Sequence, residues 1–239
     1  ELLLQAKEVA EDMGFTVLHM YVDSLFVQRA GTQERMDFEP LLKAIYAQTK
    51  IPIALDGIYR WVCFLPSKRD KRIPVPNRYY GVFQSGEVKY RGIAARRRDT
   101  PYWVKKLQLQ VLDCLSQART LEEVDLYIPK AQGLIQKAWQ DLRNGKIPLE
   151  ELVITQSLSR EVERYKTPSP AARAAGQLLA TGKTTAPGQF MRFVFVRGNE
   201  RVRAWELGVD PRTVDVEMYR LLMERATDEI MSIFVQDVL

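Results

Sequence analysis

The sequence predicts an α+β fold, with antiparallel β-hairpins and helices in the first 97 residues and mainly helices after them. Two observations support this prediction. Alternating apolar residues bounded by turn signals recur before residue 97, whereas apolar residues three or four positions apart recur after it. A chain of 239 residues can form two modest domains, each with a hydrophobic core, so we expect domains at 1–97 and 98–239.

The first part of the chain predicts two helices and several β segments. Residues 2–13 carry apolar side chains at helical spacing, and Gly14 is suited to ending that helix. Residues 16–29 predict a strand, a tight turn near 21–24 and a second strand. Asp37 and Pro40 open a short helix that is expected to reach residue 50. Further β segments are predicted at IPIAL (51–55), IYRWVCFL (58–65) and YYGVFQSGEVKYRG (79–92), the last as a hairpin that turns at Ser85 and Gly86.

Two long helices are predicted at the start of the second part. Apolar residues over 104–115 mark one buried stripe. Thr120 and Glu123 have the spacing of a capping box, and apolar residues continue at helical spacing from there to Gly145. Pro129 is expected to bend this second helix or to end it early.

The rest of the chain predicts shorter elements and a final helix. Residues 151–165 and 168–181 indicate short segments, the second of them helical. The alternation in PGQFMRFVFVRG (187–198) predicts a strand. The last helix is expected to have Asp210 as its N-cap and Pro211 in its first turn.

Composition excludes several kinds of protein. No apolar run approaches the roughly 18 to 20 residues that cross a bilayer, and the start does not resemble a signal peptide, so we expect a soluble protein without a membrane partner. Because the chain starts with Glu1 inside an apolar helical pattern, it is expected to be a piece of a longer polypeptide. Cys63 and Cys114 are flanked by apolar residues, which favours buried thiols in a reducing compartment. With a single histidine, His19, and no zinc pattern, any chemistry must rest on carboxylates, whose natural partner is Mg²⁺.

Positive charge is concentrated in one block of the sequence. The whole chain has a net charge of +5, but residues 60–106 hold thirteen Lys or Arg against three acidic residues. Tyr79, Tyr80, Tyr90, Tyr102 and Trp103 are interleaved with these cations. Such a block is typical of a surface that binds a polyanion, although a solvated loop would explain SKRDKR (67–72) equally well.

The stretch HMYVDSLFV (19–27) places one carboxylate, Asp23, among apolar and β-prone residues. A carboxylate at the tip of a hairpin can hold a divalent metal, because the strands fix the ligand before the metal arrives. From composition alone, Asp23 can also be an ordinary turn residue.

Four segments, taken in order, resemble the C-terminal part of the family B DNA polymerases. They are GFTVLHMYVDSLFV (14–27), which resembles motif C, NRYYGVF (77–83), VKYRGIAARRRDTPYW (88–103), and LVITQSLSREVERYK (152–166) with the segment that runs on to Gly198. The resemblance covers essentially the whole chain. It implies the C-terminal part of a palm domain over 1–97 and a thumb domain over 98–239.

The resemblance also implies a metal site. Asp23 occupies the position of the catalytic aspartate that binds the Mg²⁺ ions of phosphoryl transfer, and Asp56 lies where the family has a glutamate that would support those ions. A surface turn would explain Asp56 as well. The sequence departs from the family at Tyr21, which replaces the first aspartate of motif C, so one negative charge is missing. His19 replaces a family tyrosine on a strand, and packing explains it better than catalysis.

The resemblance implies contacts to DNA from several further residues. Arg78 and Tyr80 match the family's Lys-x-Tyr motif at the primer terminus, with arginine in place of lysine. The arginines are expected to bind phosphates without reading base sequence, although some can instead pair with nearby acids such as Asp99. The complete set of expected DNA ligands is Ser24, Arg78, Tyr80, Arg91, Arg97, Arg98, Tyr165 and Lys166, with Lys183, Arg192 and Arg197 as weaker candidates.

These observations predict the palm and thumb portion of a DNA-directed DNA polymerase, cytoplasmic and associated with the nucleoid of a prokaryote. Its partners would be template-primer DNA, deoxynucleoside triphosphates and Mg²⁺, with a sliding clamp as a further candidate. The chain alone should not polymerise, because it lacks the upstream aspartate and the fingers motif of the family. The alternatives are a polymerase relative that has lost catalysis and holds DNA, and an RNA-binding protein.

Overall fold

The computed structural model describes residues 1–67 and 73–234, and it divides the chain into two compact units, Glu1–Arg91 and Gly92–Leu239. Four cations of the basic block, Lys68, Arg69, Lys71 and Arg72, lie outside the described residues. The boundary at Arg91 lies close to the predicted division at residue 97. The assignment of the two parts as palm and thumb stays a prediction. Among the described residues, every helix is too short or too polar to span a membrane.

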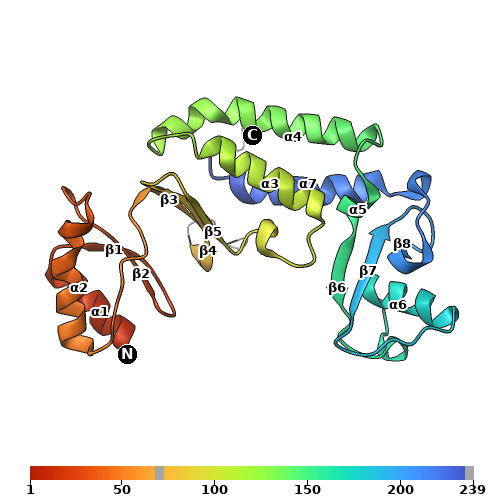
Figure 1. The fold of residues 1–239 in the computed structure, drawn as a ribbon, viewed down its shortest axis with the longest axis horizontal. Coiled ribbons are helices and arrows are strands. Elements are labelled where there is room, and N and C mark those ends of the chain that lie inside the picture. The colour runs from red at the N-terminus through yellow and green to blue at the C-terminus, as the bar shows by residue number, and fades with distance from the viewer. Residues whose placement is uncertain (68–72, 235–239) are drawn as a thin grey trace. The chain divides into compact units, whose positions relative to one another are not determined.

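The first unit begins with a helix, a hairpin and a second helix, which confirms the predicted order (Figure 1). These elements are α1 (Leu2–Asp12), β1 (Thr16–Tyr21), β2 (Ser24–Gln28) and α2 (Arg35–Thr49). Gly14 follows α1 with a φ of 80°, a conformation that favours glycine because a side chain would be strained there. The side chain of Asp37 accepts hydrogen bonds from two backbone amides in a capping box, so α2 starts at Arg35, slightly earlier than predicted.

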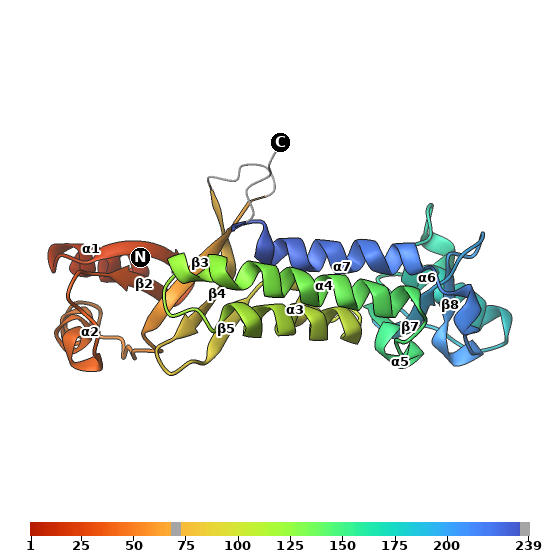
Figure 2. The ribbon, with the colours of Figure 1, turned by 90° about the horizontal axis from the view of Figure 1, so that it is seen from above.

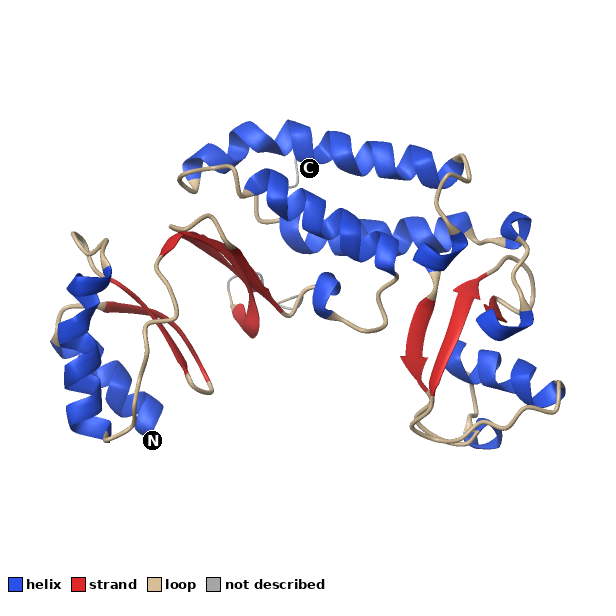
Figure 3. Cartoon of the chain, viewed as in Figure 1, coloured by secondary structure: helices blue, strands red, loops and turns tan. Residues whose placement is uncertain are grey.

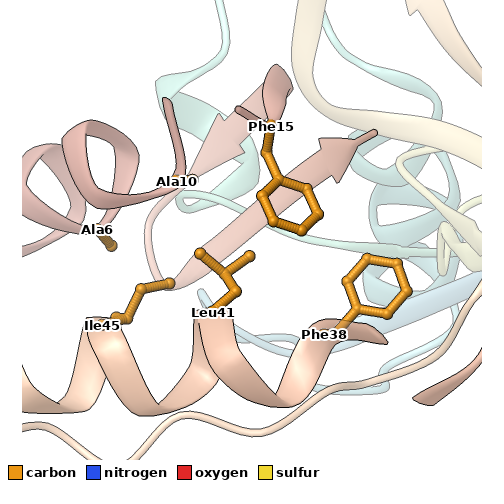
Figure 4. Packing of buried hydrophobic residues seen from close by; sticks show 6 residues of the cluster. All are labelled: Ala6, Ala10, Phe15, Phe38, Leu41 and Ile45. Atoms are coloured by element: carbon orange, nitrogen blue, oxygen red, sulfur yellow. The ribbon is translucent and has the colours of Figure 1, made fainter. Parts of the chain in front are cut away.

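A small hydrophobic core joins α1, α2 and the start of β1. Its buried members are Ala6, Ala10, Phe15, Phe38, Leu41 and Ile45, which face one another in Figure 4. The rings of Phe15 and Phe38 lie 5.9 Å apart between their centroids, and the guanidinium of Arg29 lies 4.2 Å above the Phe15 ring. This core fixes the base of the hairpin that carries Asp23.

A three-stranded antiparallel sheet completes the first unit. Its strands are β3 (Tyr59–Pro66), β4 (Pro74–Phe83) and β5 (Val88–Arg91), in the order β3-β4-β5. The predicted turn between β4 and β5 is confirmed, with Gly86 at a φ of 91°. The predicted strand over 51–55 is wrong, because this segment forms no β ladder with any other part of the chain that the structure describes. Pro52 lacks the backbone N–H that a ladder would use.

Aromatic side chains connect the β1–β2 hairpin to this sheet. The ring of Phe26 lies 5.2 Å from that of Phe64 and 5.1 Å from that of Tyr79, measured between centroids and in both cases edge to face. His19, on the neighbouring strand, lies 4.8 Å from Phe64. Since edge-to-face aromatic pairs add to the stability gained from burial, these contacts hold the hairpin rigidly against the sheet.

In the second unit, three long helices pack side by side (Figure 2). They are α3 (Tyr102–Leu115), α4 (Ile128–Arg143) and α7 (Val216–Met231). The predicted stripe over 104–115 is buried except for Leu109, which is exposed, and Tyr219 at the start of α7 is buried as well. Two turns of 3₁₀ helix, η1 (Ala94–Arg96) and η2 (Glu122–Tyr127), precede α3 and α4 respectively, and the short helix α5 (Leu149–Leu152) follows α4.

The starts of two helices differ from the prediction. The Thr120 hydroxyl accepts a hydrogen bond from the Glu123 amide, but these residues open η2, and α4 begins only at Ile128 with Pro129 in its first turn. Proline is tolerated there because the first amides of a helix have no intrahelical partner. Asp210 caps the short 3₁₀ helix η5 (Pro211–Thr213), whereas Asp215 caps α7.

The second unit also contains a three-stranded antiparallel sheet, which Figure 3 shows beside its helices. Its strands are β6 (Ile154–Ser157), β7 (Phe190–Phe195) and β8 (Val202–Ala204). The predicted strand at 187–198 and the predicted helix at 168–181 are confirmed as β7 and α6 (Pro170–Ala180). The two remaining 3₁₀ turns are η3 (Val162–Arg164) and η4 (Trp205–Leu207). Strand β8 was missed, because three residues are too few to show an alternating pattern.

Candidate functional site

The tip of the β1–β2 hairpin carries Asp23. Tyr21 and Ser24 face each other as the last pair of the ladder, so Val22 and Asp23 form a two-residue turn. Val22 has a φ of 52°, which is unusual for a β-branched residue and costs on the order of 1–3 kcal/mol. The ladder pair between Tyr21 and Ser24 closes this turn. The backbone therefore presents Asp23 in a fixed position.

Asp23 is available to a ligand. Its side chain is exposed, and its only hydrogen bond within the described residues comes from the Ser24 hydroxyl to Oδ1, at 3.3 Å. Tyr21 is also exposed, at 38% of its surface. Its phenol is a weaker ligand for a hard cation such as Mg²⁺ than a carboxylate at the same position would be.

Asp56 has a different environment. Its carboxylate forms an ion pair with the ammonium of Lys89 on β5. The part of the chain that the structure describes contains no cluster of three or more acidic, His or Cys side chains able to hold a metal. The described residues therefore fit one contact to a divalent cation, through Asp23, and further ligands would have to come from beyond them.

The remaining candidates of the first unit lie on β4 and β5. Arg78 is partly buried, and Arg91 is exposed at the end of β5, opposite Tyr79. Tyr80 is fully buried, and burial together with the adjacent Cys63 thiol raises the pKa of its hydroxyl. Burial likewise raises the pKa of Cys63 to about 12, so this cysteine is a buried thiol, as predicted. Arg91 is therefore the more accessible of the predicted DNA ligands on this sheet.

His19 is packed among aromatic rings. It lies between Phe26 and Phe64, and its Nε2 atom is buried with no hydrogen-bond partner among the described residues. Burial lowers the pKa of the imidazole from its ordinary value near 6.5. The histidine is thus neutral at pH 7 and serves packing, in agreement with the preferred interpretation of the sequence.

A basic groove of about 490 Å³ lies within the second unit. It is lined by Arg96, Arg97, Arg98 and Asp99 at and after the end of η1, and by Thr155, Gln156 and Ser157 of β6 and Phe190 of β7. The guanidinium of Arg98 lies 4.5 Å above the Phe190 ring, which orients it by a cation–π contact. Hydroxyl groups and arginines along one groove are suited to phosphate oxygens.

Sequence reasoning missed Gln108 and Glu229, which hold the turn η1 beside this groove. Gln108 on α3 is fully buried and accepts a hydrogen bond from the Ala95 amide at 2.6 Å. Glu229 on α7 accepts one from the Ala94 amide at 2.9 Å and pairs with Arg97 at 2.9 Å. The sequence signal for a buried hydrogen bond here was Gln108, a polar residue within an apolar stripe.

Tyr165 and Lys166 lie after η3, away from regular structure. The Tyr165 hydroxyl is 2.8 Å from the Ser159 hydroxyl and accepts a hydrogen bond from the Ser159 amide at 3.1 Å. These bonds lower the pKa of Tyr165. The guanidinium of Arg160 lies 5.4 Å from the centre of its ring. Tyr165 therefore organises its own loop, while Lys166 is exposed.

Comparison with known proteins identifies the family. The sequence model of DNA polymerase family B matches residues 4–234. DNA polymerase 1 of Saccharolobus solfataricus is 26% identical over 226 residues, which cover 94% of this chain and 24% of that protein. The DNA polymerase of Archaeoglobus fulgidus is 27% identical over 82% of this chain and 23% of its own length.

A solved structure agrees with these relatives. The family B DNA polymerase of the hyperthermophilic archaeon Pyrobaculum calidifontis matches all of this chain with a TM-score of 0.63 and 25% identity, over 28% of its own length. The chain thus spans about a quarter of the length of these polymerases. It follows from the family match, which extends over nearly every residue, that the chain belongs to DNA polymerase family B.

Proposed function

We propose that this chain is the palm and thumb portion, 1–97 and 98–239, of a DNA-directed DNA polymerase. The observation that carries the proposal is Asp23, an exposed carboxylate held at a rigid hairpin tip in a chain of family B. Template-primer DNA and deoxynucleoside triphosphates would be the substrates of the whole protein, in the cytoplasm of a prokaryote, with a sliding clamp as a further partner. The chain alone would be inactive.

Asp23 would provide one ligand to catalytic Mg²⁺. Bound Mg²⁺ stabilises the charge that develops on the oxygens of a phosphoryl transfer. The contribution of this chain is geometric: the hairpin holds the carboxylate before the metal arrives, so no ordering of the backbone is required on binding. Asp56 supplies negative charge only if its ion pair with Lys89 opens.

The cations of both units would hold the DNA. Arg78 and Arg91 in the first unit and Arg98 and Lys166 in the second are the proposed ligands, with Ser24 and Tyr165 as neutral candidates. The two other residues of the expected set have internal partners or positions, because Arg97 is paired with Glu229 and Tyr80 is fully buried. Contacts to phosphates are independent of base sequence, as a polymerase requires. The groove beside Arg98 supports this role, because it combines arginines with the hydroxyls of Thr155 and Ser157.

A second function is favoured by Tyr21. Because Tyr21 stands where a carboxylate would strengthen metal binding, the protein can instead be a relative that has lost catalysis and retains DNA binding. The two functions share the basic surfaces and differ only at the hairpin tip. They are therefore separated by measuring catalysis and DNA binding on the same preparation.

The test is primer extension by the full-length protein with Mg²⁺, compared with its Asp23→Asn variant. Asparagine keeps the shape of the side chain and removes its charge. We expect extension to fall by about 100-fold or more, because metal stabilisation is worth several kcal/mol and about 1.4 kcal/mol corresponds to a factor of ten in rate. Asp12→Asn is the matched control, since Asp12 is an exposed acid in the same unit at the end of α1.

The outcomes separate the proposals. Extension that depends on Asp23 and not on Asp12 supports the polymerase. Primed DNA bound without extension by the unmutated protein supports the DNA-binding relative. Extension that survives Asp23→Asn overturns the role of Asp23, and a protein that neither binds nor extends primed DNA overturns both functions.

A further inference from the structure

We infer that Glu229 is a positioning residue that fixes the turn with three consecutive arginines, and that it divides their roles. Arg97 is paired with Glu229, while Arg96 and Arg98 are left to contact phosphates. This inference rests on the proposed DNA-binding function and deepens it.

The turn η1 is tied to two helices by side-chain hydrogen bonds. Glu229 Oε2 on α7 accepts the Ala94 amide at 2.9 Å and the Gln108 amide group at 3.2 Å. Gln108 on α3 accepts the Ala95 amide at 2.6 Å and donates to the Ala226 carbonyl, also at 2.6 Å. Two consecutive backbone amides of η1 are therefore held by side chains from different helices. A turn held in this way keeps its position because both helices are anchored in the core.

The carboxylate of Glu229 is well placed to hold Arg97 as well. Its second oxygen, Oε1, accepts a hydrogen bond from the Arg97 guanidinium at 2.9 Å. Only 10% of the Glu229 side chain is exposed, so leaving that charge without Arg97 would be costly. Because the ion pair satisfies both groups, Arg97 contributes little net charge to the surface.

Arg96 and Arg98 differ from Arg97 in this respect. All three arginines are exposed, but neither Arg96 nor Arg98 forms an ion pair with a residue that the structure describes. Arg98 rests on the Phe190 ring at 4.5 Å, and both arginines line the groove that also contains Thr155 and Ser157. Uncompensated cations beside hydroxyl groups are the chemistry that recognises a phosphodiester backbone.

Salt dependence of DNA binding distinguishes the three arginines. Each phosphate contact changes the slope of log affinity against log salt concentration by about 0.9 for duplex DNA. In the full-length protein, we expect Arg96→Ala and Arg98→Ala each to make the slope shallower by about 0.9. The charge-matched double variant R97A/E229Q removes both members of the ion pair and keeps an acceptor for the Ala94 amide. We expect it to leave the slope unchanged.

The positioning role of Glu229 is tested by a double-mutant cycle. In a Glu229→Ala background the Ala94 amide loses its acceptor, so Arg96→Ala should no longer change the slope. In a Glu229→Gln background the acceptor is retained, and Arg96→Ala should again change it by about 0.9. Thermal melting of each variant verifies that it is folded. If Glu229→Ala does not fold, Glu229→Asp replaces it in the cycle, because the aspartate carboxylate is one methylene shorter and is drawn back from the Ala94 amide.

Several results would overturn the inference. The division of roles is wrong if R97A/E229Q makes the slope of log affinity against log salt as shallow as Arg96→Ala does. It is also wrong if Arg96→Ala and Arg98→Ala leave that slope unchanged. The positioning role is wrong if Arg96→Ala has the same effect with Ala and with Gln at position 229. Failure of the unmutated protein to bind duplex DNA would instead overturn the proposed function, and the inference with it.

Discussion

At the scale of single residues, Tyr21 places a phenol next to the turn that carries Asp23. We predict that Tyr21→Asp in the full-length protein speeds primer extension by about tenfold or more, because a carboxylate is a stronger Mg²⁺ ligand than a phenol and about 1.4 kcal/mol corresponds to a factor of ten. Tyr46→Asp is the matched control, since Tyr46 is an exposed tyrosine on α2 of the same unit. A slower Tyr21→Asp variant would show that the phenol itself is required.

His19 makes the stability of the first unit depend on pH. Burial lowers the pKa of His19 in the folded protein below its ordinary value near 6.5. As the pH falls through that value, the unfolded chain therefore binds more protons than the folded protein, and the free energy of unfolding decreases. We predict that His19→Phe raises the free energy of unfolding by about 1 kcal/mol at pH 7, since it removes a buried atom without a partner. The gain should be larger at pH 5.5.

Denaturant unfolding at the two pH values, of the unmutated protein and of His19→Phe, measures this difference. His19 is the only histidine of the chain, so the change in pH dependence between the two proteins reports on this side chain. An equal gain at both pH values would contradict the lowered pKa.

At the scale of elements, Tyr219 connects α7 to two other segments. Its hydroxyl donates to the Leu152 carbonyl at 2.7 Å and accepts the Phe195 amide at 3.1 Å, and burial raises its pKa. We predict that Tyr219→Phe lowers the free energy of unfolding by about 1–3 kcal/mol, because two buried backbone groups lose their partner. Tyr102→Phe is the control, since Tyr102 is 61% exposed, and it should change unfolding little in the same denaturant titration.

The elements also show which local signals are reliable. Long helices with an apolar stripe and hairpins with a glycine turn were predicted, because these patterns act over a few neighbouring residues. Helix starts were less accurate, since Asp210 and Asp215 both have the chemistry of a cap and only packing decides which one opens the long helix. The segment 51–55 has strand-like residues but no partner strand, which no local pattern reveals.

At the scale of the whole molecule, the cations of both units should act together on DNA. If about five phosphates are neutralised, log affinity of the full-length protein for primed duplex should fall with log salt at a slope of roughly −4 to −5. Fluorescence anisotropy over a series of salt concentrations measures this slope. A flat dependence would contradict the DNA-facing role of the basic residues, whatever the state of the catalytic centre.

The candidate site was only partly accessible from the sequence. Asp23 was singled out because it is a carboxylate between two β-prone arms and because its segment resembles motif C. Its role as a metal ligand stays a prediction. The ion pair of Asp56 with Lys89 and the contacts of Arg97 with Glu229 were not found, because the partners are far apart along the chain and no spacing rule connects them. The same applies to Gln108, whose polar side chain in an apolar stripe pointed to a buried hydrogen bond without identifying its partners.

The sequence by itself determined the α+β class, the order of the main helices and hairpins, the place of Asp23 at a turn and the family likeness, because each depends on residues that are close together in the chain. Only the tertiary structure decided which charges are free. Whether a cation is exposed to a ligand or held by a carboxylate depends on distances between separate elements, such as α7 and the turn η1, and packing alone sets those distances.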